Sequence, residues 1–222
     1  MFESKYSKVL TVILVIVIVA IIGLLGFLAY DYYQNYIVTK DTSEFVDNFQ
    51  GDVTDEEGND NNGTVADSNE TNPFEQIKDA NAGSSSSKKQ TYKGFGVLGT
   101  MEIPATNFKY PVLEKVTKKS IETAVAFLYG TGLNQSGNSV IIGHNYRNGL
   151  FFSNNKKLNM GDKIYITDTE GKKLTYTIYN KFETTPEDTS FYQRDTGGKP
   201  EITLSTCTDD SSARLIIFAR AE

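Results

Sequence analysis

One uncharged apolar run near the amino terminus constrains this chain more than any other feature. Residues 9–30 read VLTVILVIVIVAIIGLLGFLAY, which is 22 residues without a charged side chain. About 20 apolar residues in a helix span the hydrocarbon core of a bilayer. A cleaved signal peptide is the alternative, but its apolar core is usually shorter and ends at small residues, which the sequence FLAYD at 27–31 does not offer. We therefore predict an uncleaved transmembrane anchor over residues 9–30.

The charges on either side of this run predict its orientation. Lys5 and Lys8 precede it, whereas Asp31 follows it and the next basic residue is Lys40. Positive charge is preferentially retained on the cytoplasmic side of a membrane. We expect residues 1–8 to form a cytoplasmic tail of a single-pass cell-membrane protein, and the remainder of the chain to lie outside the cell.

The next segment, residues 31–91, is predicted to be an acidic flexible stalk. Between Asp41 and Ala80 there are 12 Asp and Glu residues and one basic residue, Lys78, and most of the others are Asn, Gly, Ser and Thr. High net charge with few large apolar side chains does not offset the entropy lost on ordering. The segment contains no DxDxDG-type loop, so we interpret it as a solvated tether and not as a calcium site.

Residues 92–222 are predicted to form one folded domain. This stretch carries 16 Lys and Arg and 14 Asp and Glu, so the chain's net charge of −6 arises in the stalk. Nucleic-acid binding is not indicated, because there is no basic stripe with interleaved aromatic residues. The chain has one cysteine and therefore no intramolecular disulfide, so a domain outside the cell must rely on its own apolar core.

This domain is rich in predicted strands and poor in predicted helix. Apolar runs and alternation predict strands at 99–104, 108–113, 139–144, 163–167, 173–182, 201–207 and 213–221, a short helix at 118–128 and one or two helical turns at 150–160. Residues 183–200 are predicted to be a polar loop with one aromatic pair, Phe191 and Tyr192. Seven or eight strands in about 130 residues favour an all-β fold with a closed or nearly closed barrel.

The only cysteine and the only histidine each end a predicted strand. Cys207 closes the run EITLSTC and His144 closes the run SVIIGH, so both are predicted to lie where a strand meets a polar loop. A thiol and an imidazole together form a minimal unit for nucleophilic acyl transfer. The alternatives are a small buried cysteine and an ordinary surface or core histidine. These two residues are too few for a zinc site, so we expect no metal and no other cofactor.

Arg214 begins the strand after Cys207, with six residues between them. If the two strands form an antiparallel hairpin, side chains roughly opposite each other lie about 5 Å apart at Cβ. A guanidinium cannot act as a base, because its pKa exceeds about 12. The roles open to it are to hold a substrate carbonyl, to stabilise an oxyanion and to favour the thiolate. The alternative is a solvent-facing strand residue.

Three motifs, in this order, resemble those of sortases, the membrane-anchored cysteine transpeptidases of Gram-positive bacteria. GHN at 143–145 is similar to their histidine segment, TLSTC at 203–207 fits their TLxTC signature, and Arg214 falls where their arginine falls. The resemblance covers residues 95–222 and implies a sortase-type β-barrel. Class B sortases usually carry a long helical insertion in the loop before the cysteine strand. The 18 residues at 183–200 look more like the compact class D or E members.

The resemblance implies a catalytic set of His144, Cys207 and Arg214. Cys207 would attack the Thr–Gly carbonyl of an LPxTG-like sorting motif near the C-terminus of a secreted protein. His144 would protonate the leaving amine, and Arg214 would steady the oxyanion. The thioacyl enzyme would then pass the protein to an amine of a cell-wall precursor or of a pilin. We expect substrate-binding residues in the loop 183–200 and on the strand that leads to Cys207, at Thr203, Ser205 and Thr206.

Two other classes of function remain open from the residues alone. A papain-like or NlpC/P60-like cysteine peptidase would hydrolyse its substrate, but such enzymes usually place the cysteine before the histidine and at a helix start. Here His144 precedes Cys207, and Cys207 ends a strand. A non-catalytic surface barrel such as an adhesin would use neither side chain.

Overall fold

The computed structural model describes residues 5–51 and 90–222 of the chain. Within the predicted tail only residues 5–8 are described, and segment 52–89 of the predicted stalk lies outside the described residues. The chain divides into two compact units, one up to Asp41 and one from Thr42 to Glu222.

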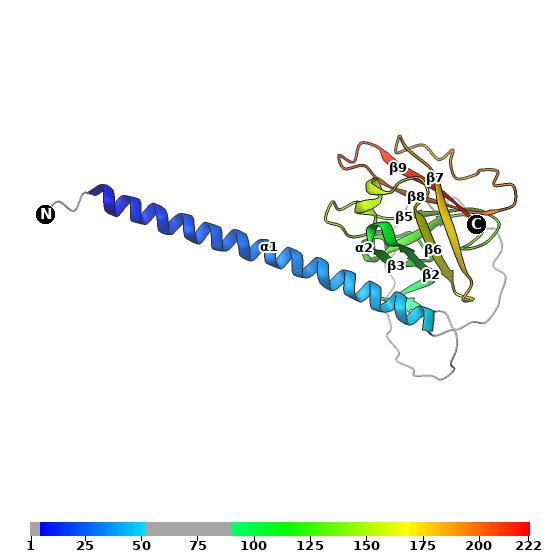
Figure 1. Ribbon diagram of the computed structural model, residues 1–222, viewed down its shortest axis with the longest axis horizontal. Coiled ribbons are helices and arrows are strands. Elements are labelled where there is room, and N and C mark those ends of the chain that lie inside the picture. Colours follow the sequence, from blue (N-terminus) through cyan, green and yellow to red (C-terminus); the bar gives the residue numbers. More distant parts are fainter. Residues whose placement is uncertain (1–4, 52–89) are drawn as a thin grey trace. The chain divides into compact units, whose positions relative to one another are not determined.

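Helix α1 runs from Lys5 to Gly51 (Figure 1). Within Val9–Phe49 it is long and apolar enough to cross a membrane, and the described part of the chain holds no second helix of this kind. The large apolar side chains of residues 9–30 are exposed, which suits a lipid surrounding. The helix does not end near Tyr30, however. The first part of the predicted stalk, residues 31–51, is helical and not flexible coil.

Nine strands are found in the described residues, and eight of them close into a barrel. The elements after α1 are β1 (Thr91–Tyr92), β2 (Phe95–Ile103), η1 (Pro104–Thr106), β3 (Phe108–Leu113), α2 (Lys118–Thr123), β4 (Val125–Tyr129), β5 (Gly137–Ile142), η2 (Phe152–Lys157), β6 (Lys163–Asp168), β7 (Lys173–Thr184), β8 (Pro200–Cys207) and β9 (Arg214–Ala221). The barrel order is β2-β3-β4-β5-β8-β9-β7-β6, and β6 pairs with β2 to close the ring. The predicted closed β-barrel with short helices is therefore confirmed.

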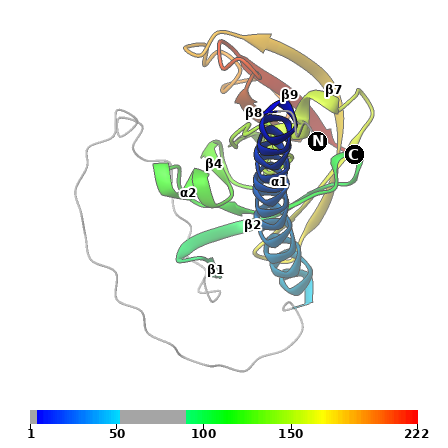
Figure 2. The same ribbon diagram turned by 90° about the vertical axis from the view of Figure 1, so that its left-hand side faces the viewer.

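Figure 2 shows how the ring is arranged, with β8 and β2 on opposite sides of the barrel. The β3–β4 and β5–β8 pairs are parallel, and the other pairs in the ring are antiparallel. Because β5 and β8 run in the same direction, their carboxyl ends meet at one edge of the sheet. The antiparallel partner β9 begins at that same edge.

The last turns of α1 belong to the second unit. Thr42, Val46 and Phe49 are buried, and their spacing places them on one face of the helix. Between them, the ring of Phe45 meets the ring of Tyr92 in β1 at a centroid distance of 5.0 Å. This buried face explains why the helix continues past the predicted boundary, because tertiary packing is the main source of helix stability in proteins.

The predicted helix at 118–128 is shorter in the structure. Thr117 and Ser120 form a reciprocal capping box at its start, and α2 ends at Thr123. Residues Val125–Tyr129 are β4 instead, where they pair with β3 on one side and β5 on the other. Strand pairing and burial of β-branched and aromatic side chains therefore outweigh local helix propensity in this segment.

Candidate active site

His144, Cys207 and Arg214 follow or occupy neighbouring strand ends at one edge of the sheet. Ile142, the last residue of β5, is paired in parallel with Ser205 of β8, and two residues further along each chain lead to His144 and Cys207. Cys207 is itself the register partner of Arg214 at the start of β9. Neighbouring strands lie about 5 Å apart. The fold thus brings the three predicted catalytic residues to adjacent backbone positions.

Alternation along β8 decides which side chains share a face with the thiol. Successive side chains of a strand point to opposite faces, so Thr203 and Ser205 lie on the same face as Cys207. Arg214, opposite Cys207, lies on this face too. We call this side of β5, β8 and β9 the outer face. The other face of these strands points into the barrel core, where Leu204 is fully buried.

Gly143 fixes the path of the chain into His144. A Cβ atom at Gly143 would lie 2.8 Å from Val125 and 2.9 Å from Phe152, so only glycine fits without displacing its neighbours. Its carbonyl oxygen accepts a hydrogen bond from the hydroxyl of Thr206 at 2.7 Å. His144 is consequently held beside the end of β8.

The surroundings of His144 favour its neutral form. Its ring lies against Tyr146 with a centroid distance of 4.8 Å. Partial burial lowers the pKa of His144 below its ordinary value of 6.5, and the negative charge of Glu122 acts in the opposite direction. A neutral imidazole at pH 7 can accept a proton from a neighbouring acid.

A cavity of about 160 Å³ lies beside Cys207. Asp209 at its wall accepts hydrogen bonds from Lys156 and from Asn145 Nδ2, and these contacts lower the pKa of Asp209. Asn145 Nδ2 also donates to the carbonyl oxygen of Cys207 at 3.0 Å. Asn145 therefore ties the segment that follows His144 to the strand end that carries the thiol.

Two of the three predicted substrate-binding residues on β8 have other contacts. Thr203 is fully buried, and its hydroxyl donates to Asn138 Oδ1 at 2.8 Å and accepts from Arg194 at 3.2 Å. Thr206 points away from the outer face, and its hydroxyl is bonded as described above. Thr203 thus lies beneath the contacts of Arg194, whereas Thr206 lines the cavity beside Cys207. A role for either residue in substrate binding stays a prediction. Ser205 stays on the outer face, 8% exposed, between Thr203 and Cys207.

Apolar and aromatic side chains cover the outer face next to Cys207. The buried residues are Val140, Phe191, Ile216 and Phe218, and Leu128, Tyr129, Ile142, Phe182 and Tyr192 pack around them. Phe191 and Tyr192 come from the β7–β8 loop (residues 185–199), and the Tyr192 ring lies 5.5 Å from that of Tyr129. Burial raises the pKa of Tyr192, and the charge of Arg214 opposes this, so the loop reaches the field of the predicted catalytic arginine.

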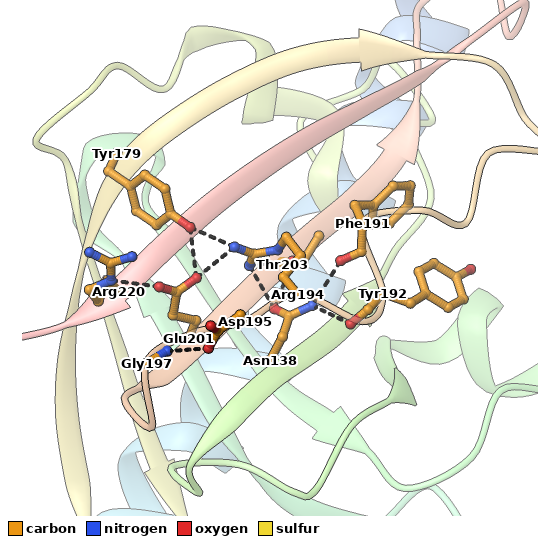
Figure 3. A network of polar contacts seen from close by, with 10 residues as sticks. All are labelled: Asn138, Tyr179, Phe191, Tyr192, Arg194, Asp195, Gly197, Glu201, Thr203 and Arg220. Atoms are coloured by element: carbon orange, nitrogen blue, oxygen red, sulfur yellow. Dashed lines mark hydrogen bonds and ion pairs between the residues drawn. The ribbon is translucent and has the colours of Figure 1, made fainter.

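Sequence reasoning missed the polar residues that hold this loop. Asn138 and Arg194 were not singled out, although both lie at the centre of the network in Figure 3. One signal was available. Glu201 is the one charged residue of strand β8, and its side chain is completely buried in the structure. A buried charge requires partners of opposite sign.

Comparisons with known proteins point to one family. A family model described as a sortase domain matches residues 101–222. A sortase A from Bacillus anthracis is 33% identical over 124 residues, which is 54% of this chain and 58% of that protein. The chain spans about three fifths of the length of the curated relatives that it matches.

Solved structures agree with the family model. Sortase A from Corynebacterium diphtheriae matches with a TM-score of 0.53 and 30% identity, over 58% of this chain and 61% of that one. A Clostridium perfringens sortase D5 transpeptidase matches with a TM-score of 0.52 and 27% identity, over 57% and 79%. Sortases named A and D match about equally, so similarity to class D or E stays a prediction. The family model covers more than half of the sequence on the barrel described above, and the chain belongs to the sortase family.

Proposed function

We propose that this chain is a membrane-anchored cysteine transpeptidase that acts on secreted proteins with a C-terminal sorting motif. The observation that carries the proposal is the adjacency of His144, Cys207 and Arg214 at one sheet edge. Membership of the sortase family supports the reaction class. The helix α1 supports the membrane anchor. The charges of Lys5 and Lys8 favour residues 1–8 in the cytoplasm, which would place the catalytic domain, 92–222, outside the cell.

In the acylation step, neutral His144 takes the proton of the Cys207 thiol as the sulfur attacks the Thr–Gly carbonyl of an LPxTG-like motif. A free thiol has a pKa of about 8.5, so little thiolate is present at pH 7 without such a base. Arg214 donates to the oxyanion of the tetrahedral intermediate. When the C–N bond breaks, His144 returns the proton to the leaving glycine amine and a thioester remains on Cys207.

In the transfer step, an amine of a cell-wall precursor or of a pilin attacks the thioester. His144 takes a proton from the attacking nitrogen, and Arg214 again donates to the oxyanion. The C–S bond breaks as the new amide forms, and the proton on His144 restores the thiol of Cys207. The net reaction exchanges one amide bond for another, and atoms and charge balance without a cofactor.

The experiment that tests this function uses the full-length protein in detergent micelles with a library of pentapeptide motifs carrying a fluorophore and a quencher. We expect cleavage of an LPxTG-like peptide and, with hydroxylamine present, a peptide hydroxamate that traps the thioester. Cys207→Ala is expected to have no activity, and cleavage by that variant would end the assignment. Cleavage without any hydroxamate or amine adduct would support the hydrolytic peptidase instead.

A second variant tests the role of Arg214. Arg214→Lys keeps the charge but not the planar fork, so we expect kcat/KM to fall about 100-fold, which is the usual loss when one oxyanion donor is removed. Arg147→Lys is the matched control, because Arg147 is exposed and bonds only weakly to Ser211 at 3.5 Å. Near-normal turnover of Arg214→Lys would contradict the role given to it.

A further inference from the structure

Asn138, the second residue of β5, uses both ends of its amide in the interior of the protein. Its Nδ2 donates to the carbonyl oxygens of Phe191 and Tyr192 at 3.1 and 3.0 Å. Its Oδ1 accepts from the Thr203 hydroxyl at 2.8 Å and from Arg194 at 2.9 Å. Because Thr203 and Arg194 supply donors on one side and the loop supplies only acceptors on the other, the amide has one satisfied orientation.

Arg194 joins this amide to a buried carboxylate (Figure 3). Its guanidinium donates to Glu201 Oε2 and to the hydroxyl oxygen of Tyr179, both at 2.6 Å, and stacks 3.7 Å over the Phe218 ring. Glu201 also accepts from Tyr179 at 2.7 Å and from Arg220 at 2.5 Å. Burial alone would raise the pKa of Glu201, but the hydrogen bonds from its partners outweigh this and lower it, so the carboxylate stays charged.

The network lies too far from the thiol to take part in the chemistry. Glu201 and Cys207 are six residues apart on one strand, which corresponds to about 20 Å. What the network does contact is the β7–β8 loop. Its hydrogen bonds to the carbonyl oxygens of Phe191 and Tyr192 hold the part of the loop whose Tyr192 ring packs against Tyr129. The charge of Arg214 also acts on Tyr192, where it opposes the rise in pKa that burial causes.

We propose that Asn138 and Arg194 are positioning residues that hold the β7–β8 loop in place before substrate arrives, so that Tyr192 and Tyr129 form a fixed wall of the peptide groove beside Arg214. The identity of the ligand, an extended sorting peptide, rests on the proposed function. A binding loop that is already ordered loses less conformational freedom when its ligand binds. Release of the loop should therefore weaken peptide binding and leave the chemical step nearly unchanged.

The decisive variant is Asn138→Asp. An aspartate keeps the shape and the two acceptor contacts with Thr203 and Arg194, but it has no N–H to donate to the loop carbonyls. We expect KM for the cleaved motif peptide to rise about tenfold and kcat to change less than twofold. Arg194→Ala should behave in the same way. Wild-type KM in both variants would overturn the proposal.

Tyr176→Phe is the matched control for a general loss of buried hydrogen bonding. The Tyr176 hydroxyl donates to Asn134 Oδ1 at 3.0 Å, in a separate polar cluster that does not contact the β7–β8 loop. We expect this variant to keep the wild-type KM at a temperature where it is folded. A rise in KM equal to that of Asn138→Asp would show that the effect is not specific to the loop, and would overturn the proposal.

A second readout does not need activity. The chain contains no tryptophan, so Tyr192→Trp places a single indole fluorophore on the loop of the full-length protein. We expect acrylamide to quench this indole weakly in the Tyr192→Trp background, several-fold more strongly when Asn138→Asp is added, and no more strongly when Tyr176→Phe is added. Equal, strong quenching in all three proteins would overturn the proposal.

The two readouts separate this inference from the proposed function. If no peptide is cleaved, the proposed function fails, but the quenching of the loop indole still decides whether Asn138 holds the loop. If peptides are cleaved and the quenching does not depend on Asn138, the function stands and this inference alone falls.

Discussion

Two buried asparagines four residues apart hold different parts of the barrel by the same chemistry. Asn134 precedes β5, and its Nδ2 donates to the carbonyl of Lys172 at 2.7 Å and to Asp168 Oδ2 at 3.1 Å. Its Oδ1 accepts from Tyr176. Asn134 thus attaches the segment before β5 to the β6–β7 hairpin. Asn138 uses its amide in the same way to attach β5 to the β7–β8 loop.

The difference between the two sites lies in what each amide holds. The β6–β7 hairpin has a strand ladder of its own, from Lys163 paired with Thr177 to Thr167 paired with Lys173, so Asn134 adds stability to a segment whose position is already set. The β7–β8 loop forms no strand ladder, so its position depends on side-chain contacts such as those of Asn138. A buried asparagine amide therefore has a structural role at Asn134 and, in our proposal, a functional role at Asn138.

The largest effect on stability is expected from Glu201→Gln. This change leaves Arg194, whose side chain is only 16% exposed, and Arg220 without their counter-charge, and breaking a buried ion pair on one side costs about 3 kcal/mol. Urea denaturation followed by circular dichroism measures the loss. Glu222→Gln, which removes an exposed partner of Lys163, should cost much less, because ion pairs in contact with solvent contribute little to stability. Equal losses would mean that the buried network is no stronger than a surface pair.

The next effect compares one tyrosine from each network. Tyr176→Phe leaves Asn134 Oδ1 buried without its donor, so we expect a loss of about 2 kcal/mol in the free energy of unfolding and an unchanged KM. Tyr179→Phe removes one of three donors from Glu201, so we expect a loss below about 1 kcal/mol and a KM raised by a few fold. Denaturation and peptide kinetics on the same preparations measure both. Equal changes in the free energy of unfolding and in KM for the two variants would contradict the distinction between the Asn134 and Asn138 sites.

A smaller effect appears as the pH is lowered. The folded-state pKa of Glu201 lies below its unfolded value, which is about 4.3, so its contribution to stability is complete above that value and is lost as the pH falls through the folded-state pKa. The stability difference between wild type and Glu201→Gln should therefore shrink below about pH 4. Denaturation curves between about pH 6 and pH 2.5 measure it. A difference that is constant over this range would contradict the assignment.

The smallest expected effect is a shift in the pH profile of kcat/KM, which distinguishes residues that act on His144 from residues that act on the β7–β8 loop. The charge of Glu122 raises the pKa of His144, so Glu122→Gln should lower it further and move the acid limb of kcat/KM to lower pH. Glu201→Gln should leave the midpoint of that limb in place, because its network acts on the loop. Glu187→Gln, an exposed change within the loop, is the control. A shift with Glu201→Gln but not with Glu122→Gln would contradict both assignments.

Much of the barrel was predictable because a strand pattern is local. Alternation over 173–182 predicted β7, and the apolar run ending in Cys207 predicted β8. Order along the chain placed His144 and Arg214 at strand ends, and the pairing of β5, β8 and β9 then brings these ends together. The predicted helix reaching Leu128 was too long because the pairing of β4 depends on partners distant in sequence.

The remaining differences come from contacts that composition cannot reveal. The acidic composition of 41–80 concealed the spacing of Val46 and Phe49, which bury one face of α1. Alternation predicted that Thr203 shares a face with Cys207, but it could not show that a loop covers Thr203. Asn138 was missed for the same reason, since its partners lie more than 50 residues away in the sequence.

The hydrogen bonds from Asn138 to the β7–β8 loop also limit how the loop sequence can change during evolution or in the laboratory. The stretch before Phe191 has contacts of its own, in which Asp188 accepts from the Thr184 hydroxyl and from the Ser190 N–H. The N–H of Tyr192 also donates to the carbonyl oxygen of Thr189 at 3.0 Å, so insertions that leave residues 188–192 intact should preserve the aromatic wall and alter only what flanks it. A single residue added between Tyr192 and Arg194 would shift the backbone carbonyls that bind Asn138 relative to the guanidinium that binds Glu201, so both contacts could not form at once. Libraries aimed at a new sorting motif should diversify the loop residues before Asp188 and spare residues 188–194.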